Sequence, residues 1–131
     1  MAIIDIDHFK QVNDRFSHLV GDEVIQLVAD YLKQAVSSPN IVARWGGEEF
    51  TLLIHGDQLE AEEYCEQLRK GLSELECAAL EDQFQLTVSI GLSNALGCPD
   101  YQTLLKRADH ALYEAKETGR NRVVSYQEFR H

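Results

Sequence analysis

Residues 44–50 have the sequence RWGGEEF, and they lie between two apolar segments. These segments, IVARW at residues 41–45 and FTLLI at residues 50–54, are rich in β-branched and aromatic residues. Such segments on either side of paired glycines predict antiparallel strands joined by a tight turn, because glycine adopts the backbone angles that tight turns require. We therefore expect a β-hairpin that carries two carboxylates, Glu48 and Glu49, at its turn.

The residues before the hairpin predict one strand and one long helix. Residues 2–6, AIIDI, form a short β-branched run, which predicts a buried strand with Asp5 near its end. Apolar residues between positions 24 and 35 recur every three and four residues, as on one face of a helix. We expect this helix to follow Gly21 and to stop near Pro39.

The second half of the chain predicts two further helices and two further strands. Residues 57–72 begin with an aspartate and a glutamate three positions apart, a capping-box pattern, and continue with a helical apolar stripe. Residues 86–92 alternate apolar with small or polar side chains, which predicts a strand with one buried face. Residues 101–115 predict a helix that ends at Gly119, before a last strand at residues 122–126.

The order of these elements and the length of the chain predict one domain. The 131 residues can bury a single core without disulfides, and no repeat or linker divides them. Helices alternate with strands, and the hairpin makes neighbouring strands antiparallel. We therefore expect an α/β (α+β) fold with a mostly antiparallel central sheet and flanking helices. The order of the strands does not follow from the pattern.

Composition excludes several classes of protein. A net charge of −10 and a pI near 4.8 argue against a nucleic-acid partner, because the phosphate backbone requires clustered lysine and arginine. No run of apolar residues is long enough for a transmembrane helix, so we expect no direct membrane contact. Three cysteines, an odd number without a C-x-x-C pair, argue against a disulfide framework and indicate a reducing cytoplasm.

Three carboxylates fall where predicted strands end: Asp5, Glu48 and Glu49. Two carboxylates about 4 Å apart repel each other by roughly 4 kcal/mol at an effective dielectric of 20. Either one carboxylate keeps a proton, or a cation lies between the two. Oxygen ligands suit Mg²⁺, and the sequence offers no histidine and cysteine set of the kind that zinc prefers. The alternative is that an acidic turn on an acidic protein has no chemical role.

Four motifs in order decide between these readings, because together they resemble the GGDEF-domain diguanylate cyclases. The motifs are DIDHFKQVND at residues 5–14, HLVGD at 18–22, RWGGEEF at 44–50 and ADHALYEAKETGRN at 108–121. The resemblance covers nearly the whole chain. It implies that residues 1–131 form a single GGDEF domain with the palm-like fold of nucleotide cyclases. It also implies an enzyme of the nucleotidyltransferase class.

The resemblance assigns roles to particular residues. The implied metal ligands for Mg²⁺ (or Mn²⁺) are Asp5, the main-chain carbonyl of Ile6, and Glu48. The implied GTP-binding residues are Phe9, Lys10, Asn13, Asp22, Gly46, Gly47, Lys116 and Arg120. Within this set, Lys10, Lys116 and Arg120 resemble phosphate-binding cations, and Asn13 and Asp22 resemble guanine readers. Glu49 is implied to lie near the attacking 3′-hydroxyl, as a base or a second metal ligand, and is placed with Asp5 and Glu48 in the catalytic group.

The reaction that the resemblance implies is the condensation of two GTP into cyclic di-GMP and two pyrophosphates. Each domain would hold one GTP, so catalysis would need a homodimer, and an upstream sensory domain would control its geometry. The alternative is an inactive GTP-binding or dimerisation module that regulates a neighbour. We expect a cytoplasmic location, either free or as the cytoplasmic part of a membrane-tethered sensor.

Two departures from the family pattern carry expectations of their own. The chain lacks the segment that precedes the first strand in the family, so we expect weaker GTP binding and an exposed apolar surface. Ser37 and Asn40 occupy the places of an arginine and an aspartate that bind cyclic di-GMP as a feedback inhibitor in many relatives. We therefore expect no inhibitory product site at Ser37 and Asn40.

Overall fold

A five-stranded sheet forms the centre of the protein, which a computed structural model describes over residues 1–80 and 84–127. The strand order is β2-β3-β1-β4-β5. The strands are β1 Ala2–Ile6, β2 Ile41–Gly46, β3 Glu49–Leu53, β4 Val88–Leu92 and β5 Val123–Ser125. Neighbouring strands are antiparallel except β4 and β5, which are parallel. The predicted hairpin and the mostly antiparallel sheet are confirmed.

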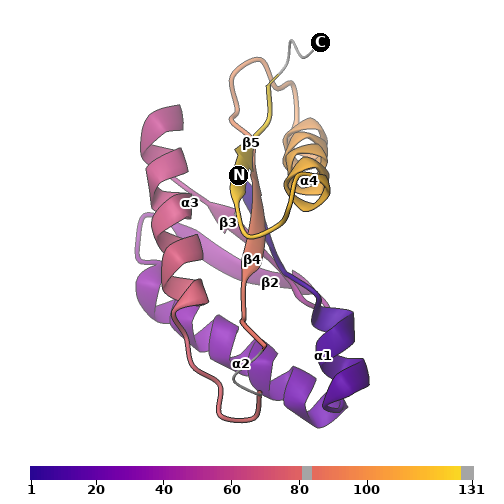
Figure 1. Ribbon diagram of the computed structural model, residues 1–131. Coiled ribbons are helices and arrows are strands. Elements are labelled where there is room, and N and C mark those ends of the chain that lie inside the picture. The colour runs from indigo at the N-terminus through magenta and orange to yellow at the C-terminus, as the bar shows by residue number, and fades with distance from the viewer. Residues whose placement is uncertain (81–83, 128–131) are drawn as a thin grey trace.

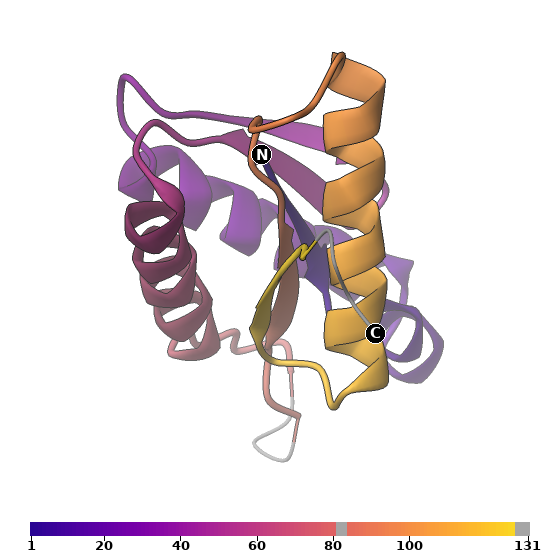
Figure 2. The same cartoon turned by 90° about the horizontal axis from the view of Figure 1, so that it is seen from above.

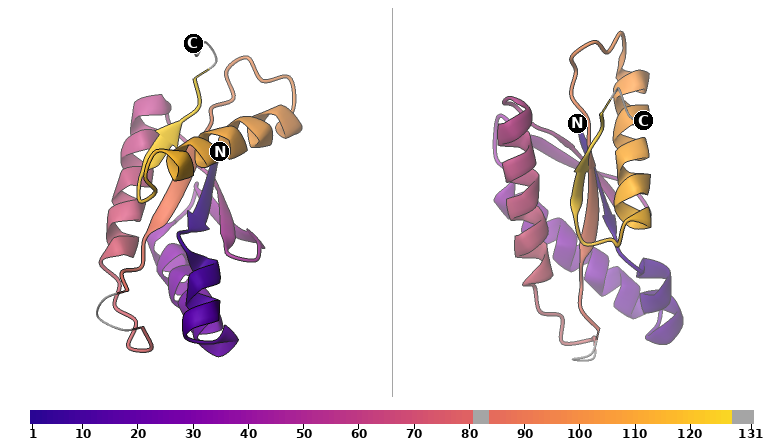
Figure 3. Two further views of the ribbon diagram at one scale, coloured as in Figure 1. Left: turned by 45° about the vertical axis from the view of Figure 1, so that its right-hand side comes forward. Right: turned by 45° about the horizontal axis from the view of Figure 1, so that its top comes forward.

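Helices cover both faces of the sheet (Figure 1). Helices α2, His18–Ala35, and α3, Gln58–Ser73, pack on one face, and α4, Tyr101–Glu117, packs on the other. Figure 2 and the right panel of Figure 3 show the sheet between α3 and α4. A short helix, α1 at Phe9–Arg15, follows β1 directly and lies against α2. This layered arrangement is the predicted α/β (α+β) fold.

Strand β1 is the central strand, and it is buried on both faces. Ile4 and Ile6 contribute to the core beneath α2 and α3, whereas Ile3 belongs to the core beneath α4. Because side chains alternate along a strand, Asp5 points to the same face as Ile3, toward α4. The sequence of β1 therefore delivers a carboxylate to the α4 side of the sheet.

Strand β4 differs from its prediction, because both of its faces are buried. Ser89 is fully buried, and Gly91 lies directly against α4. A Cβ atom added to Gly91 would lie 2.3 Å from the Ala108 carbonyl oxygen and 2.3 Å from the Leu112 amide nitrogen. The small residues that suggested a solvent-facing side instead let the helix backbone approach the strand.

The other helices follow their predictions to different degrees. Helix α3 has the predicted capping box: the Glu60 amide donates to Asp57 Oδ1 at 2.9 Å, and the Asp57 amide donates to Glu60 Oε1 at 3.2 Å. Helix α2 begins at His18, earlier than predicted, because the Ser17 hydroxyl accepts from the Val20 amide. Helix α1 was not predicted; Val12 is its one buried residue, so it has no apolar stripe.

The edge strand β2 exposes apolar side chains. Helix α4 packs on β4, β5 and β1, whereas Ile41 and Trp45 on β2 are 58% and 55% exposed. Trp45 precedes the hairpin turn and lies on the edge strand of the sheet.

No described helix has the length and apolar content required to cross a bilayer.

Replacing Gly91 by alanine is expected to destabilise the fold by about 1–3 kcal/mol, because the backbone of α4 cannot move away from a new methyl group without unpacking. Thermal and urea unfolding measure the change. Gly46→Ala is the control, since an added Cβ there meets no atom within 4 Å. Equal unfolding midpoints for the two variants would contradict the close approach of α4 to β4.

Candidate functional site

The end of β1 meets the hairpin turn. Asp5 lies opposite Glu49 in the β1–β3 register, and the Ile6 amide donates to the Glu48 carbonyl at 3.3 Å. Cβ atoms of directly opposed residues in antiparallel strands are about 5 Å apart. Figure 1 shows this turn beside the junction of β1 and α1. The structure therefore brings the predicted catalytic carboxylates to one end of the sheet.

A cation from the far end of the chain neutralises part of this charge. Lys116, in the last turn of α4, donates from Nζ to Asp5 Oδ2 in an ion pair. Burial raises the pKa of Asp5, and Lys116 opposes that rise. Burial also raises the pKa of Glu49, and the nearby charge of Asp5 raises it further. The site thus holds carboxylates that are costly to keep ionised together.

A hollow of about 290 Å³ opens at this place. The residues that line it are Asp5, Ile6, Asp7, His8, Phe9, Lys10, Gln11, Glu48, Lys116 and Arg120. The list contains all the predicted metal ligands and all three predicted phosphate-binding cations. The hollow therefore combines carboxylate oxygens with positive side chains, which is a suitable environment for a metal-bound polyphosphate.

The predicted guanine readers lie on the adjoining helices. Gly21, in α2, faces α1 so closely that an added Cβ would lie 1.8 Å from Asn13 Oδ1 and 3.2 Å from Phe9 Cζ. Asp22 follows Gly21 and is exposed. Phe9 and Asn13 thus meet Gly21 where α1 packs on α2, and Asp22 is the next residue of α2. Sequence reasoning did not assign Gly21 a role, although its place before Asp22 in the HLVGD motif was a signal.

The hairpin turn is open to solvent. Gly47 has a φ of 53°, which glycine adopts without strain. Arg44 donates from Nε and Nη2 to the Gly47 carbonyl at 3.1 and 2.7 Å, and so holds the turn. Gly46 and Gly47 have no side chain to obstruct a ligand. They lie beside the hollow rather than in its lining.

Asp7 is a buried carboxylate that the sequence analysis did not single out. It is 4% exposed and accepts hydrogen bonds from Ser89 Oγ at 2.6 Å, Thr87 Oγ1 at 2.7 Å and the Asn121 amide at 3.0 Å. These donors lie next to or on β4 and in the turn after α4. Asp7 therefore joins three segments at the wall of the hollow, and its oxygens are already occupied by protein donors.

Among the described residues, no three histidine, cysteine, aspartate or glutamate side chains gather so that they could hold a metal ion by themselves. The predicted ligand set has two carboxylates, Asp5 and Glu48, and one main-chain carbonyl. Mg²⁺ bound by few protein groups takes its other ligands from water and substrate phosphates. The residues present fit that mode of binding, because all their donor atoms are oxygens.

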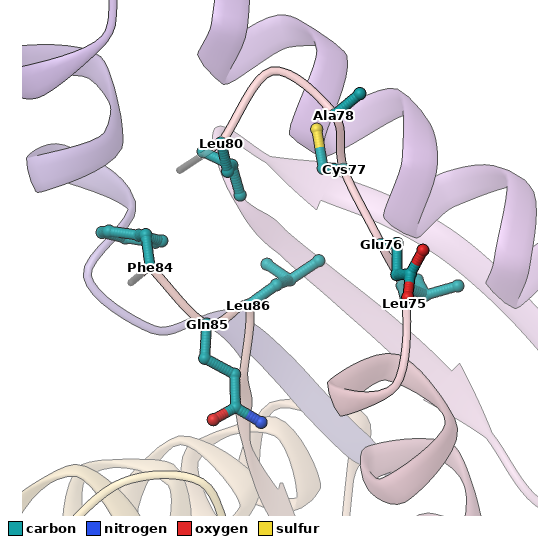
Figure 4. A pocket seen from close by; sticks show the side chains of 8 residues that line it. All are labelled: Leu75, Glu76, Cys77, Ala78, Leu80, Phe84, Gln85 and Leu86. Carbon is teal, nitrogen blue, oxygen red and sulfur yellow. The ribbon is translucent and has the colours of Figure 1, made fainter. Parts of the chain in front are cut away.

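A larger hollow, of about 590 Å³, lies in the loop between α3 and β4 (Figure 4). Its described lining includes Leu75, Leu80, Phe84 and Leu86, and one charged side chain, that of Glu76. Among its described lining residues there is no lysine or arginine, so this hollow offers no cation for phosphate. The smaller hollow at the end of β1 is therefore the candidate functional site.

Ser37 and Asn40 lie in a turn before β2. The Asn40 amide donates to the Ser37 carbonyl at 2.9 Å, and Asn40 Oδ1 accepts from the His55 amide at 2.8 Å. The side chain of Asn40 thus holds a loop at the edge of the sheet. The absence of an inhibitory cyclic di-GMP site at these residues stays a prediction.

The family profile of the GGDEF domain, described as diguanylate cyclase, matches residues 1–122. Diguanylate cyclase DgcP of Pseudomonas aeruginosa is 37% identical over 124 residues, which are 94% of this chain and 18% of that relative. The chain therefore spans about a fifth of the length of this curated relative.

Solved structures agree with the sequence comparison. The GGDEF domain of DgcB from Caulobacter crescentus, in complex with c-di-GMP, has a TM-score of 0.87 and 36% identity, with 95% of this chain and 75% of that chain covered. The active GGEEF domain of a diguanylate cyclase from Vibrio cholerae has a TM-score of 0.86 and 35% identity, with 98% and 82% covered. The chain has the palm-like fold of these domains, and it belongs to the GGDEF-domain diguanylate cyclase family.

Proposed function

We propose that this chain binds GTP with Mg²⁺ (or Mn²⁺) and, facing a second copy, condenses two GTP into cyclic di-GMP and two pyrophosphates. The observation that carries the proposal is the single hollow in which Asp5 and Glu48 meet Lys10, Lys116 and Arg120. Carboxylates alone would repel a triphosphate, and cations alone would not hold a metal. Their combination in a GGDEF domain favours a metal-bound nucleoside triphosphate.

The base is selected where α1 meets α2. Asp22 is exposed there and, when ionised, accepts hydrogen bonds only. Guanine presents donors at N1 and N2, whereas adenine has no donor at N1, so Asp22 favours GTP over ATP. Asn13 adds an amide that can both donate and accept, and Phe9 contributes an apolar wall beside it.

The metal site would consist of Asp5, Glu48 and the carbonyl of Ile6. The raised pKa of Asp5 supports this role, because a divalent cation would compensate the buried charge. When bound, Mg²⁺ supplies positive charge that neutralises the triphosphate and polarises its phosphoryl oxygens. Lys10, Lys116 and Arg120 would bind the remaining phosphate oxygens.

The reaction joins the 3′-oxygen of one GTP to the α-phosphorus of the other. The bond from the α-phosphorus to the bridging oxygen breaks, pyrophosphate leaves with the electron pair, and the hydroxyl proton passes to Glu49. The raised pKa of Glu49 makes it a better base than an ordinary carboxylate. The same step, repeated with the roles exchanged, closes the ring. Two domains must therefore face each other, and an upstream sensory domain would set their approach.

Binding of GTP is the first test, because it does not require the dimer. A Mg²⁺-dependent rise in the unfolding temperature is expected with GTP and not with ATP. A GTP concentration of 100 times the dissociation constant should raise the free energy of unfolding by about 2.7 kcal/mol. Asp22→Asn is expected to lose the preference for GTP, since its amide also donates to the base. No shift with either nucleotide would overturn the proposal, and a shift without cyclic di-GMP formation by the dimer would favour an inactive GTP-binding module.

Replacing Gly21 by alanine is expected to weaken GTP binding about tenfold, because the new methyl group would displace the Asn13 side chain. Isothermal titration with GTP measures the loss. Glu23→Ala, on the exposed surface of the same helix, is the control and should bind like the parent protein. Unchanged affinity in Gly21→Ala would remove Asn13 from the guanine pocket.

Replacing Glu49 by glutamine is expected to stabilise the ligand-free protein at neutral pH. A carboxyl whose pKa is raised by folding holds its proton more tightly in the folded state, so its ionisation costs stability as pH rises from the ordinary value of 4.5 through the raised value. The glutamine variant avoids this loss, and its advantage should disappear below pH 4.5. Unfolding temperatures across this range test the sign, and an advantage confined to acid pH would contradict it.

A further inference from the structure

The turn that carries Arg120 has an unusual backbone. Gly119, Arg120 and Asn121 have φ values of 128°, 62° and 47°, so two residues other than glycine adopt the left-handed region in succession. Each such residue costs of the order of 1 kcal/mol or more unless its surroundings hold it. The turn therefore depends on contacts from other segments to keep Arg120 at the hollow.

Two hydrogen bonds hold Asn121 from outside the turn. The Asn121 amide donates to Oδ2 of Asp7, a lining residue of the hollow, at 3.0 Å. The Asn121 side-chain oxygen accepts from Arg69 Nη1 at 2.6 Å. Within the turn, the Arg120 amide donates to the Ala115 carbonyl at 2.9 Å. Asn121 is thus fixed at its backbone by Asp7, the residue after β1, and at its side chain by Arg69 of α3.

Glu66, in the same helix, orients the Arg69 side chain for its hydrogen bond to Asn121. Glu66 accepts from Arg69 Nε at 3.0 Å and from Nη2 at 2.5 Å, which fixes the plane of the guanidinium group and leaves Nη1 for Asn121. The Arg69 side chain is 17% exposed, and the hydrogen bond from Arg69 keeps the pKa of Glu66 below its ordinary value. Arg69 lies in none of the four motifs and does not line the hollow.

We propose that Arg69, acting through Asn121, is a positioning residue for Arg120, which rests on the proposed role of Arg120 in binding the triphosphate. Arg69 does not touch the nucleotide. It holds the Asn121 side chain from α3 while Asp7 holds the Asn121 amide, and together they keep the preceding residue in the left-handed conformation that directs Arg120 to the hollow. The ion pair between Arg69 and Glu66 is partly exposed and contributes little stability by itself. The effect of Arg69 on the turn therefore comes from its hydrogen bond to Asn121.

Amide hydrogen exchange in the ligand-free protein tests the positioning directly. Arg69→Ala is expected to speed exchange of the Asn121 amide about tenfold, the effect of losing one hydrogen bond to a charged group. Lys70→Ala is the matched control. Lys70 is the next residue of α3 and is exposed, so this variant also removes one positive charge from the helix. Equal exchange at Asn121 in the parent protein, the control and Arg69→Ala would overturn the proposal, whether or not GTP binds.

The second measurement separates positioning from general destabilisation. Arg69→Ala is expected to weaken GTP binding about tenfold and to leave guanosine binding unchanged, since Arg120 reaches phosphate only. In an Asn121→Ala background, Arg69→Ala should have no further effect, because the contact is already absent. Equal losses for GTP and guanosine, or additive losses in the double variant, would overturn the proposal. Absence of GTP binding by the parent protein would overturn the proposed function, and amide exchange would still decide the role of Arg69.

Discussion

The burial of β1 on both faces is the constraint on which the rest of the structure depends. The strand pairs with β3 and β4, and it delivers Asp5 and Asp7 to places that are 3% and 4% exposed. A buried carboxylate is costly unless it is paired or hydrogen-bonded. Lys116 of α4 pairs with Asp5, whereas the hydroxyl groups of Thr87 and Ser89 and the Asn121 amide donate to Asp7. The packing of the core and the arrangement of the residues at the hollow therefore depend on each other.

Local signals made part of this structure predictable. The hairpin followed from paired glycines between β-branched segments, and the start of α3 followed from the Asp57–Glu60 capping box. The motif resemblance located the residues of the hollow, because Asp5, Lys10, Glu48, Lys116 and Arg120 belong to three of the four motifs. Metal binding and guanine recognition stay predictions, since they concern groups that bind to the protein.

Features that depend on distant contacts were not predictable. Helix α1 buries Val12 alone, so the sequence shows no apolar stripe there. Ser89 is polar yet fully buried, because a helix more than ten residues later covers it and its hydroxyl donates a hydrogen bond to Asp7. Asp7 gave no local signal either, since its partners are 80 or more residues away in the chain. The spacing of apolar residues shows which side of an element is buried. It does not show a polar residue that is buried by contacts with distant segments.

Trp45 gives the protein a built-in optical reporter. It is the single tryptophan of the chain, it is 55% exposed, and it immediately precedes the two glycines of the hairpin turn. Indole emission shifts when the polarity around the ring changes, so any ligand or second protein that covers this turn alters the fluorescence of the whole chain at one known position. Events at the hairpin turn can therefore be followed in solution without a label.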